Sequence, residues 1–322
     1  MFFSKFQQPA YNLKMNNPEI RYLQHEEIDF EKWDRCIANS INGIVYAGSW
    51  YLDRICNRWD ALVYGDYLYV MPLVWNRKFG ISYVYQPFFT QQLGVFSAFS
   101  VDKEMVNSFI HAIPGKFRLV EMNLNYQNIP GSGKISVKSN ITYHLPLAYS
   151  IKTIREQYSD NTRRNLKKAG QQKLFAAPLY NIDEFIAFTK SNLQKKSPEI
   201  KTVHYQNLKR VISHALYHRL GELAGVFNSQ NQLIAAVFFV WSNRKVIYLA
   251  ASSLKEGTEK KAMFLLVDKF IESRAESELI LDFEGSNMPG VARFYEGFGA
   301  RPVSYFSIRR NTLPWYIRLL KK

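Results

Sequence analysis

Two stretches of the chain repeat one order of predicted elements. In the first stretch, three short runs rich in β-branched and aromatic residues, at 60–64, 67–75 and 81–85, are separated by turn residues, as in an antiparallel meander. A helical pattern over 102–113 ends at a Pro-Gly pair, and strand character resumes over 117–124. The first half of the chain therefore predicts the order β-β-β-α-β.

The second stretch begins with the same meander, in runs at 222–227, 233–241 and 246–251. A helix capped by Thr258 follows, with its apolar residues on one face, and 279–283 predicts a buried strand. The element order of the first half is thus repeated.

A short helix from Pro289 through Tyr295 and a last strand at 303–309 complete the second stretch. Together the two stretches predict an α/β fold with mixed sheets, built from two similar halves in tandem. The repeat is one of pattern, because no short-period sequence repeat is visible.

A linker near Ser150 separates the two halves in this interpretation. We expect a poorly ordered extension at 1–17, a first domain at 18–149 and a second domain at 150–310. The segment 311–322 is expected to pack back on the first domain. Its aromatic and basic residues would also suit peripheral contact with an anionic membrane surface.

Composition narrows the class of protein. The 322 residues, 47% of them hydrophobic, suffice for about two folded domains. Charged or amide side chains break every apolar run before the roughly 18 residues that a membrane-spanning helix needs.

Cys36 and Cys56 form neither a disulfide framework nor a metal set, which indicates reduced thiols and a cytoplasmic location. The histidines show no ligand spacing, so no metal is expected.

The net charge of +15 lies almost entirely in the second half. Residues 1–149 hold 14 basic and 12 acidic side chains, and residues 150–322 hold 28 and 15, which gives +2 and +13. Such an excess favours a polyanionic partner, namely CoA phosphates, tRNA or an anionic membrane surface, or it serves solubility alone.

One predicted helix concentrates positive charge. Arg163 and Lys167, like Arg164 and Lys168, are four residues apart, so all four lie on one helix face. Like charges at this spacing repel unless an anion compensates them, which favours phosphate or nucleic acid over a merely solvated face.

The connection between the strand at 246–251 and the following helix favours a pyrophosphate. Free backbone N–H groups and the helix dipole favour anions there, and lysines add charge, although an ordinary connector remains the alternative. The predicted cofactor-binding residues are Ala250, Ala251, Ser252, Ser253, Lys255, Gly257, Thr258, Asn287 and Arg293.

Three side chains near the end of the second half are candidates for acid–base chemistry. Asp282 and Glu284 alternate with a phenylalanine, so on a strand both carboxylates point to one face. Glu284, at the strand end, is the preferred general base, whereas Asp282 could instead be a structural partner of the neighbouring helix or of Arg293. Tyr295 is the candidate proton donor to a leaving group, or a core aromatic.

Four neutral polar residues lie at the exit of the third predicted strand, namely Tyr85, Gln86, Gln91 and Gln92. Their donors and acceptors suit a peptide-like or sugar acceptor. A loop whose hydrogen bonds are satisfied internally is the alternative interpretation.

Three stretches of the second half resemble the FemAB-like branch of the acyl-CoA N-acyltransferase (GNAT) superfamily. They are the Arg-rich helix 161–170, the segment 281–287 and the segment 291–299, which ends in Phe-Gly. The stretch 85–94 resembles the part of that family that lines the acceptor groove. The resemblance implies two tandem GNAT-like domains, the first on the acceptor side and the second on the donor side of a cleft between them. It also implies transfer of an acyl or aminoacyl group to an amine.

The predicted identity of the donor rests on one departure from the family pattern. The family's closing motif has a lysine after its phenylalanine, and this chain has Tyr295 at that position. A tyrosine there is more similar to the pattern of ordinary acyl-CoA enzymes. Acyl-CoA as co-substrate is therefore the favoured donor, with backbone amides of 246–251 polarising its carbonyl. The alternatives are a FemAB-like aminoacyltransferase that uses aminoacyl-tRNA on a cell-wall (peptidoglycan) precursor, and a non-catalytic protein that binds through its basic surface.

Overall fold

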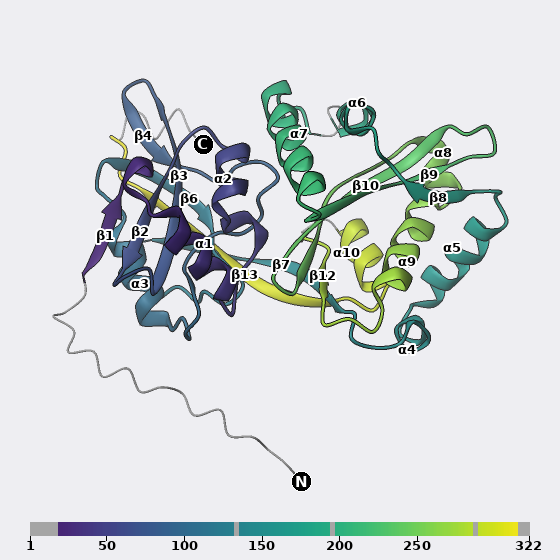
Figure 1. Cartoon of the computed structure of the whole chain (residues 1–322), viewed down its shortest axis with the longest axis horizontal. Helices are drawn as coiled ribbons and strands as arrows, with labels where there is room; N and C mark the ends of the chain where they lie inside the picture. The colour runs from purple at the N-terminus through teal and green to yellow at the C-terminus, as the bar shows by residue number, and fades with distance from the viewer. Residues whose placement is uncertain (1–18, 132–134, 194–196, 286–288, 315–322) are drawn as a thin grey trace, which may run out of the picture.

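The computed structural model describes residues 19–131, 135–193, 197–285 and 289–314. Within these ranges the strands form one continuous sheet of mixed pairing, and helices cover it in two halves that lie side by side (Figure 1). The α/β class with mixed sheets is confirmed. The predicted extension at 1–17 lies outside the described residues.

The first half contains the predicted elements and adds others before them. Its elements are β1 (Ile20–Leu23), η1 (His25–Glu27), α1 (Phe30–Asn39), η2 (Val45–Ala47), α2 (Ser49–Ile55), β2 (Trp59–Tyr64), β3 (Tyr69–Lys78), β4 (Ile81–Val84), β5 (Phe96–Ser97), α3 (Lys103–Ala112) and β6 (Phe117–Asn123). The meander, the helix and the following strand are confirmed as β2, β3, β4, α3 and β6. β3 starts later than predicted because Tyr67 has a left-handed backbone (φ 58°) in the preceding turn.

The second half also shows the predicted order. Its elements are β7 (Ser136–Pro146), α4 (Ile151–Glu156), α5 (Asp160–Gly170), β8 (Phe175–Pro178), α6 (Ile182–Leu193), α7 (Thr202–Tyr217), β9 (Gly221–Phe227), β10 (Leu233–Ser242), β11 (Lys245–Ser253), α8 (Lys255–Glu259), α9 (Ala262–Arg274), β12 (Ile280–Asp282), α10 (Pro289–Glu296) and β13 (Arg301–Asn311). The meander is β9, β10 and β11, whereas the sequence pattern did not predict β7, β8, α4, α6 or α7.

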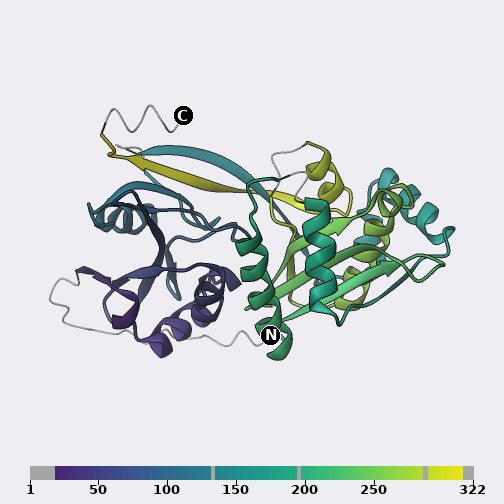
Figure 2. The same ribbon diagram turned by 90° about the horizontal axis from the view of Figure 1, so that it is seen from above.

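Two long strands cross between the halves. The sheet order around them is β6-β13-β7-β12. β7 follows β6 in the chain yet pairs with β12, through Leu281 and Leu145, whereas β13 follows β12 yet pairs with β6, through Ile308 and Met122. β7 and β13 also pair with each other, and both run the length of the junction in Figure 2.

The predicted linker position coincides with the start of a helix. Ser150 caps α4, and its hydroxyl accepts a hydrogen bond from the backbone N–H of Thr153. At the other end of the chain, the backbone N–H of Thr312 donates to the carbonyl of Arg118 in the first half, and residues 315–322 lie outside the described part. The domain boundaries stay a prediction.

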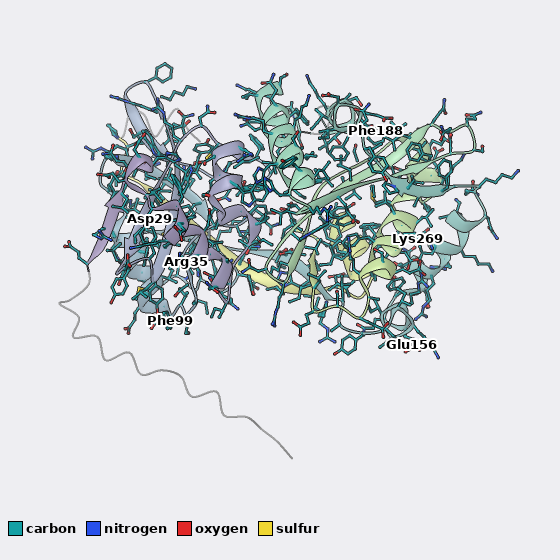
Figure 3. The ribbon with its side chains drawn as sticks, viewed as in Figure 1. Asp29, Arg35, Phe99, Glu156, Phe188 and Lys269 are labelled. Carbon is teal, nitrogen blue, oxygen red and sulfur yellow. The ribbon has the colours of Figure 1, made fainter. Side chains whose placement is uncertain are left out.

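Helices cover both faces of the second-half sheet. Neighbouring residues of β10 point to opposite faces, so Phe238 packs in the core under α6 and α7, while Phe239 stacks on Phe270 of α9 with ring centroids 3.7 Å apart. Phe188 on α6 and Lys269 on α9 mark these two layers in Figure 3. The second half is thus a three-layer α/β/α unit.

α7 also connects the second half to the first. It lies between the halves in Figure 1, and Trp50 of α2 stacks on His214 of α7 with ring centroids 4.6 Å apart. The side-chain amide of Asn207 donates to the carbonyl of Ile55 at 2.9 Å. The core of the first half therefore continues under α6 and α7 without a break.

Candidate active site

The early end of strand β12 opens a pocket in the second half. β11 and β12 pair in parallel only as far as Ile247 and Asp282, and β11 continues to Ser253. From Tyr248 onward that edge of β11 pairs with no other strand of the described residues, and Tyr248 to Ser253 line a pocket there. A bulge leaves Leu249 without a partner in β10. The resulting cavity measures about 520 Å³, which is the size of a cofactor site.

Most of the predicted cofactor-binding residues line this pocket. The structure brings together Ala250, Ala251, Ser252, Ser253, Gly257 and Thr258 on one wall. Ser252 is 6% exposed, and its hydroxyl has no hydrogen-bond partner among the described residues. A buried hydroxyl without a partner beside a cavity is suited to bond a ligand.

The other predicted cofactor-binding residues lie elsewhere. Lys255 points to solvent beside Glu259, with 92% of its side chain exposed. Arg293 is exposed on α10 and donates to the carbonyl of Pro289, so it does not pair with Asp282. Asn287 lies outside the described residues.

The helix after β11 is divided in two, contrary to the sequence interpretation. Thr258 lies inside α8 and donates its hydroxyl to the carbonyl of Leu254, so the prediction that it caps the long helix is wrong. The break occurs at Lys261, whose left-handed backbone (φ 63°) starts α9 without a side-chain cap. Lys261, Met263 and Phe264 line the pocket at this uncapped helix start.

Glu284 forms part of the opposite wall of the pocket. Burial raises the pKa of its carboxyl from 4.5 to about 8. Its side chain accepts a hydrogen bond from the hydroxyl of Tyr46, which comes from the first half. The prediction that Asp282 and Glu284 share a strand face is wrong. β12 ends at Asp282, and Glu284 has a left-handed backbone (φ 58°).

Tyr295 lies on the same wall. Its ring stacks on Phe283 with centroids 4.8 Å apart, and it is 8% exposed. Burial, followed by the negative charges of Glu284 and Asp282, raises the pKa of its hydroxyl well above the usual value. The tyrosine is therefore protonated at neutral pH, as a proton donor must be.

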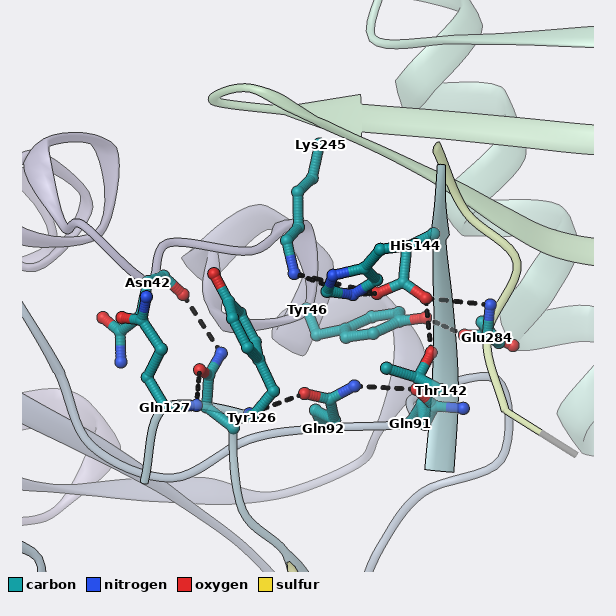
Figure 4. Close-up of polar contacts among 12 residues, drawn as sticks. Asn42, Tyr46, Gln91, Gln92, Tyr126, Gln127, Thr142, His144, Lys245 and Glu284 are labelled. Atoms are coloured by element: carbon teal, nitrogen blue, oxygen red, sulfur yellow. Dashed lines mark hydrogen bonds and ion pairs between the residues drawn. The ribbon is translucent and has the colours of Figure 1, made fainter. Parts of the chain in front are cut away.

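Asp282 does not reach the pocket. It is 1% exposed, and its carboxylate accepts hydrogen bonds from Thr142 at 2.5 Å and from the backbone N–H of Glu284 at 3.0 Å. His144 Nε2 lies 3.0 Å from its other oxygen, and Lys245 Nζ lies 3.8 Å away (Figure 4). Burial opposes ionisation of this carboxyl, but His144 and then Lys245 hold its pKa below the usual range.

The predicted acceptor residues separate into two groups. Tyr85 and Gln86 line a second cavity of about 450 Å³ over β4, β6, β7 and β13. Gln92 is fully buried; its amide donates to Gln91 in the same loop and accepts from the backbone N–H of Tyr126 in another loop. The side-chain amide of Gln91 lies next to the backbone of Gly285, but Gln91 is not among the residues that line the active-site pocket.

The predicted polyanion-binding residues lie on α5, at the outer end of the second half (Figure 1). Arg163, Arg164, Lys167 and Lys168 are all exposed. Arg163 is engaged locally, by Asp160 and by the carbonyl of Glu156. The helix lies outside the wall of the active-site pocket, so any role in binding would concern a large ligand.

Sequence reasoning missed three residues of the site. Tyr46 belongs to the short η2 helix, 238 positions before the carboxylate that it contacts. His144 and Lys245 become neighbours only because β7, β12 and β11 are adjacent in the sheet. No local motif signals such contacts.

Two further features concern metals and membranes. Among the described residues, no group of three or more His, Cys, Asp or Glu side chains is arranged to hold a metal ion. Within the same residues, no helix combines the length and the apolar composition that crossing a bilayer requires. The expectation that no metal is used remains a prediction.

Comparison with known proteins relates the fold, but not the sequence, to other chains. No protein-family model and no curated protein matches the sequence. The crystal structure of FemX superposes with a TM-score of 0.64 at 10% identity, covering 94% of this chain and 99% of that one. A conserved protein of unknown function from Bacteroides thetaiotaomicron VPI-5482 gives 0.53 at 9% identity, covering 90% and 100%. The C-terminal domain of a proposed lysylphosphatidylglycerol synthetase from Agrobacterium fabrum gives 0.50 at 8% identity, covering 91% and 94%. The chain therefore shares the fold of FemX, and it has the two similar α/β halves in tandem that the sequence predicts.

Proposed function

We propose that the protein is an N-acyltransferase that moves an acyl group from acyl-CoA to an amine by direct attack. The observation that carries this proposal is the open edge of β11, which presents unpaired backbone groups to a pocket that also holds Glu284 and Tyr295. Such an edge can hydrogen-bond an extended amide-containing chain and polarise a carbonyl at its end.

The residues of the pocket supply the proton transfers. Glu284 takes a proton from the attacking amine, and its pKa of about 8 makes its carboxylate a stronger base than an ordinary glutamate. The amine nitrogen forms a bond to the carbonyl carbon while a backbone N–H stabilises the oxyanion. When the carbon–sulfur bond breaks, the sulfur keeps the electron pair and Tyr295 protonates it. The proton held by Glu284 then restores Tyr295 through pocket water.

The start of α9 suits the phosphates of the donor. No side chain caps this helix. The N–H of Phe264 donates to the carbonyl of Lys261, which leaves the N–H groups of Ala262 and Met263 for a ligand, and Lys261 adds a positive charge at the pocket wall. The cytosolic acyl-CoA pool would then be the source of the donor, in keeping with the predicted cytoplasmic location.

A second candidate donor is aminoacyl-tRNA, with a cell-wall precursor as the acceptor. The exposed positive face of α5 favours it, because Arg164, Lys167 and Lys168 are free to contact a phosphate backbone. Binding through this face would weaken steeply as salt rises. Binding of acyl-CoA, which has far fewer phosphates than tRNA, would depend less on salt.

Thermal unfolding with CoA, acetyl-CoA and charged tRNA tests these alternatives. A ligand at 100 times its Kd stabilises the native state by about 2.7 kcal/mol, which is a shift of roughly 5 °C for a chain of this size. We expect CoA and acetyl-CoA to raise the Tm by this amount. We also expect the protein to release CoA from acetyl-CoA when a panel of amines is supplied as acceptors. Absence of any shift with all three ligands would refute the enzyme proposal.

Matched variants separate binding from chemistry. Glu284→Gln and Tyr295→Phe should keep the CoA-dependent shift but lower turnover by about 10²–10⁴-fold, the usual contribution of a general acid or base. The control is Glu259→Gln, at an exposed position on α8. Wild-type turnover in both active-site variants would refute the assignment of Glu284 as the base and Tyr295 as the acid.

A further inference from the structure

Glu284 has a backbone conformation that needs external support. Its φ of 58° lies in the left-handed region, which costs a residue with a side chain roughly 1–2 kcal/mol. The strand ladder does not hold it, because β12 ends at Asp282. The following Gly285 lies against the carbonyl of Ile141, which leaves the segment no room to relax on that side.

One hydrogen bond fixes this conformation directly. The backbone N–H of Glu284 donates to Asp282 Oδ1 at 3.0 Å. The same oxygen accepts the hydroxyl of Thr142 from β7, so the carboxylate is also anchored to the neighbouring strand. Asp282 thus connects the turn that carries Glu284 to the sheet.

A buried cation holds Asp282 in turn. Lys245 begins β11 with only 6% of its side chain exposed, and its Nζ lies 3.3 Å from His144 Nε2 and 3.8 Å from Asp282. The ammonium also lies 3.7 Å from the ring centroid of Tyr126, which belongs to the first half. The cluster in Figure 4 therefore joins both halves of the molecule at the carboxylate that supports Glu284.

We propose that Asp282 is a positioning residue: it fixes Glu284 at the pocket wall by accepting its backbone N–H, while Lys245 and His144 keep the Asp282 carboxylate in place. This inference rests on the proposed acyl transfer, in which Glu284 is the base. The competing explanation is that Asp282 merely balances the charge of Lys245. The two explanations differ in whether the oxygen acceptor or the charge matters.

Two double variants separate the acceptor from the charge. Asp282→Asn with Lys245→Met removes the ion pair but keeps an oxygen that accepts the Glu284 N–H. Asp282→Leu with Lys245→Met removes the ion pair and the acceptor together, so both proteins carry the same charges. If the Leu form does not fold, as judged by circular dichroism and urea unfolding, Asp282→Ala with Lys245→Met replaces it.

The first readout does not depend on activity. Carboxyl carbons of ¹³C-labelled glutamate are titrated by NMR, with the Glu284 signal assigned by its loss in Glu284→Gln. We expect the Asn form to titrate near the wild-type value of about 8. The Leu form should titrate at least one pH unit lower, because a released Glu284 becomes hydrated.

The second readout is CoA release from acetyl-CoA. The Leu form should have a kcat about tenfold below that of the Asn form, the kinetic equivalent of one hydrogen bond, with an unchanged KM for acetyl-CoA. Equal titration and equal kcat in the two forms would overturn the proposal. If wild type itself neither binds CoA nor releases it from acetyl-CoA, the proposed function fails, and the NMR comparison still decides whether Asp282 positions Glu284.

Discussion

The carboxyl group of Glu284 should make the stability of the protein depend on pH in a direction opposite to that of most carboxyl groups. Burial raises its pKa in the folded state from 4.5 to about 8. Between these values the folded state keeps a proton that the unfolded state releases. The free energy of unfolding therefore falls as pH rises from about 4.5 to about 8.

The size of this effect follows from the same two values. At about 1.4 kcal/mol for each pH unit, the difference between 4.5 and about 8 sets a ceiling of about 5 kcal/mol. Glu284 lines the pocket and is only partly buried, and its ionised form accepts a hydrogen bond from Tyr46, so the loss is smaller. We expect about 2–3 kcal/mol, or roughly 5 °C in Tm.

Glu284→Gln isolates the contribution, because glutamine has no proton to release. We expect the variant and wild type to have similar stability at pH 5, and the variant to be more stable by about 2–3 kcal/mol at pH 9. Urea unfolding at five pH values between 5 and 9 measures the difference. The matched control is Glu259→Gln, on the exposed side of α8.

The test depends on how the stability difference between the variant and wild type changes with pH, and not on the size of that difference at one pH. A stability difference between Glu284→Gln and wild type that stays constant from pH 5 to 9 would refute the reasoning. In that case the Glu284 carboxyl would be hydrated as in an ordinary surface residue.

Two other changes test the same wall of the pocket. Tyr46→Phe removes the hydroxyl that donates to the ionised carboxylate of Glu284, so the pKa of Glu284 measured by NMR should rise by about one pH unit. An unchanged pKa would mean that the contact does not persist in solution. Gly285→Ala places a methyl carbon 1.8 Å from the carbonyl oxygen of Ile141, and we expect a loss of about 2–4 kcal/mol in urea unfolding. Gly115→Ala, where nothing lies within 4 Å, serves as its control and should cost under about 1 kcal/mol.

Local patterns predicted the elements of the two meanders well, because short turns fix neighbouring strands. The strand β7 escaped prediction, since its first residues are exposed and its hydrophobic pattern begins only near Thr142. α6 and α7 also escaped, although they form one layer of the second half. Nothing in the sequence marks them as an insertion between β8 and β9.

In the candidate site, too, the residues that belong to a local sequence pattern were predicted, and those that come from distant parts of the chain were not. Glu284 and Tyr295 lie in one stretch with a recognisable family pattern, and the structure places both on one pocket wall. Their support comes from Tyr46, His144 and Lys245, which approach only through the order of strands in the sheet. The misassigned cap at Thr258 has a similar cause, because the left-handed turn at Lys261 leaves no signature in residue types that favour ordinary helix.

The crossing of β7 and β13 makes the two halves inseparable as folding units. A chain cut near Ser150 would leave β6 without β13 on one fragment and β12 without β7 on the other, and each would expose an unpaired, aggregation-prone strand edge. Long-range pairing of this kind forms late, because residues some 190 positions apart must meet before β6 and β13 can join. Mixing the two fragments should therefore restore a native complex, with each fragment completing the sheet of the other.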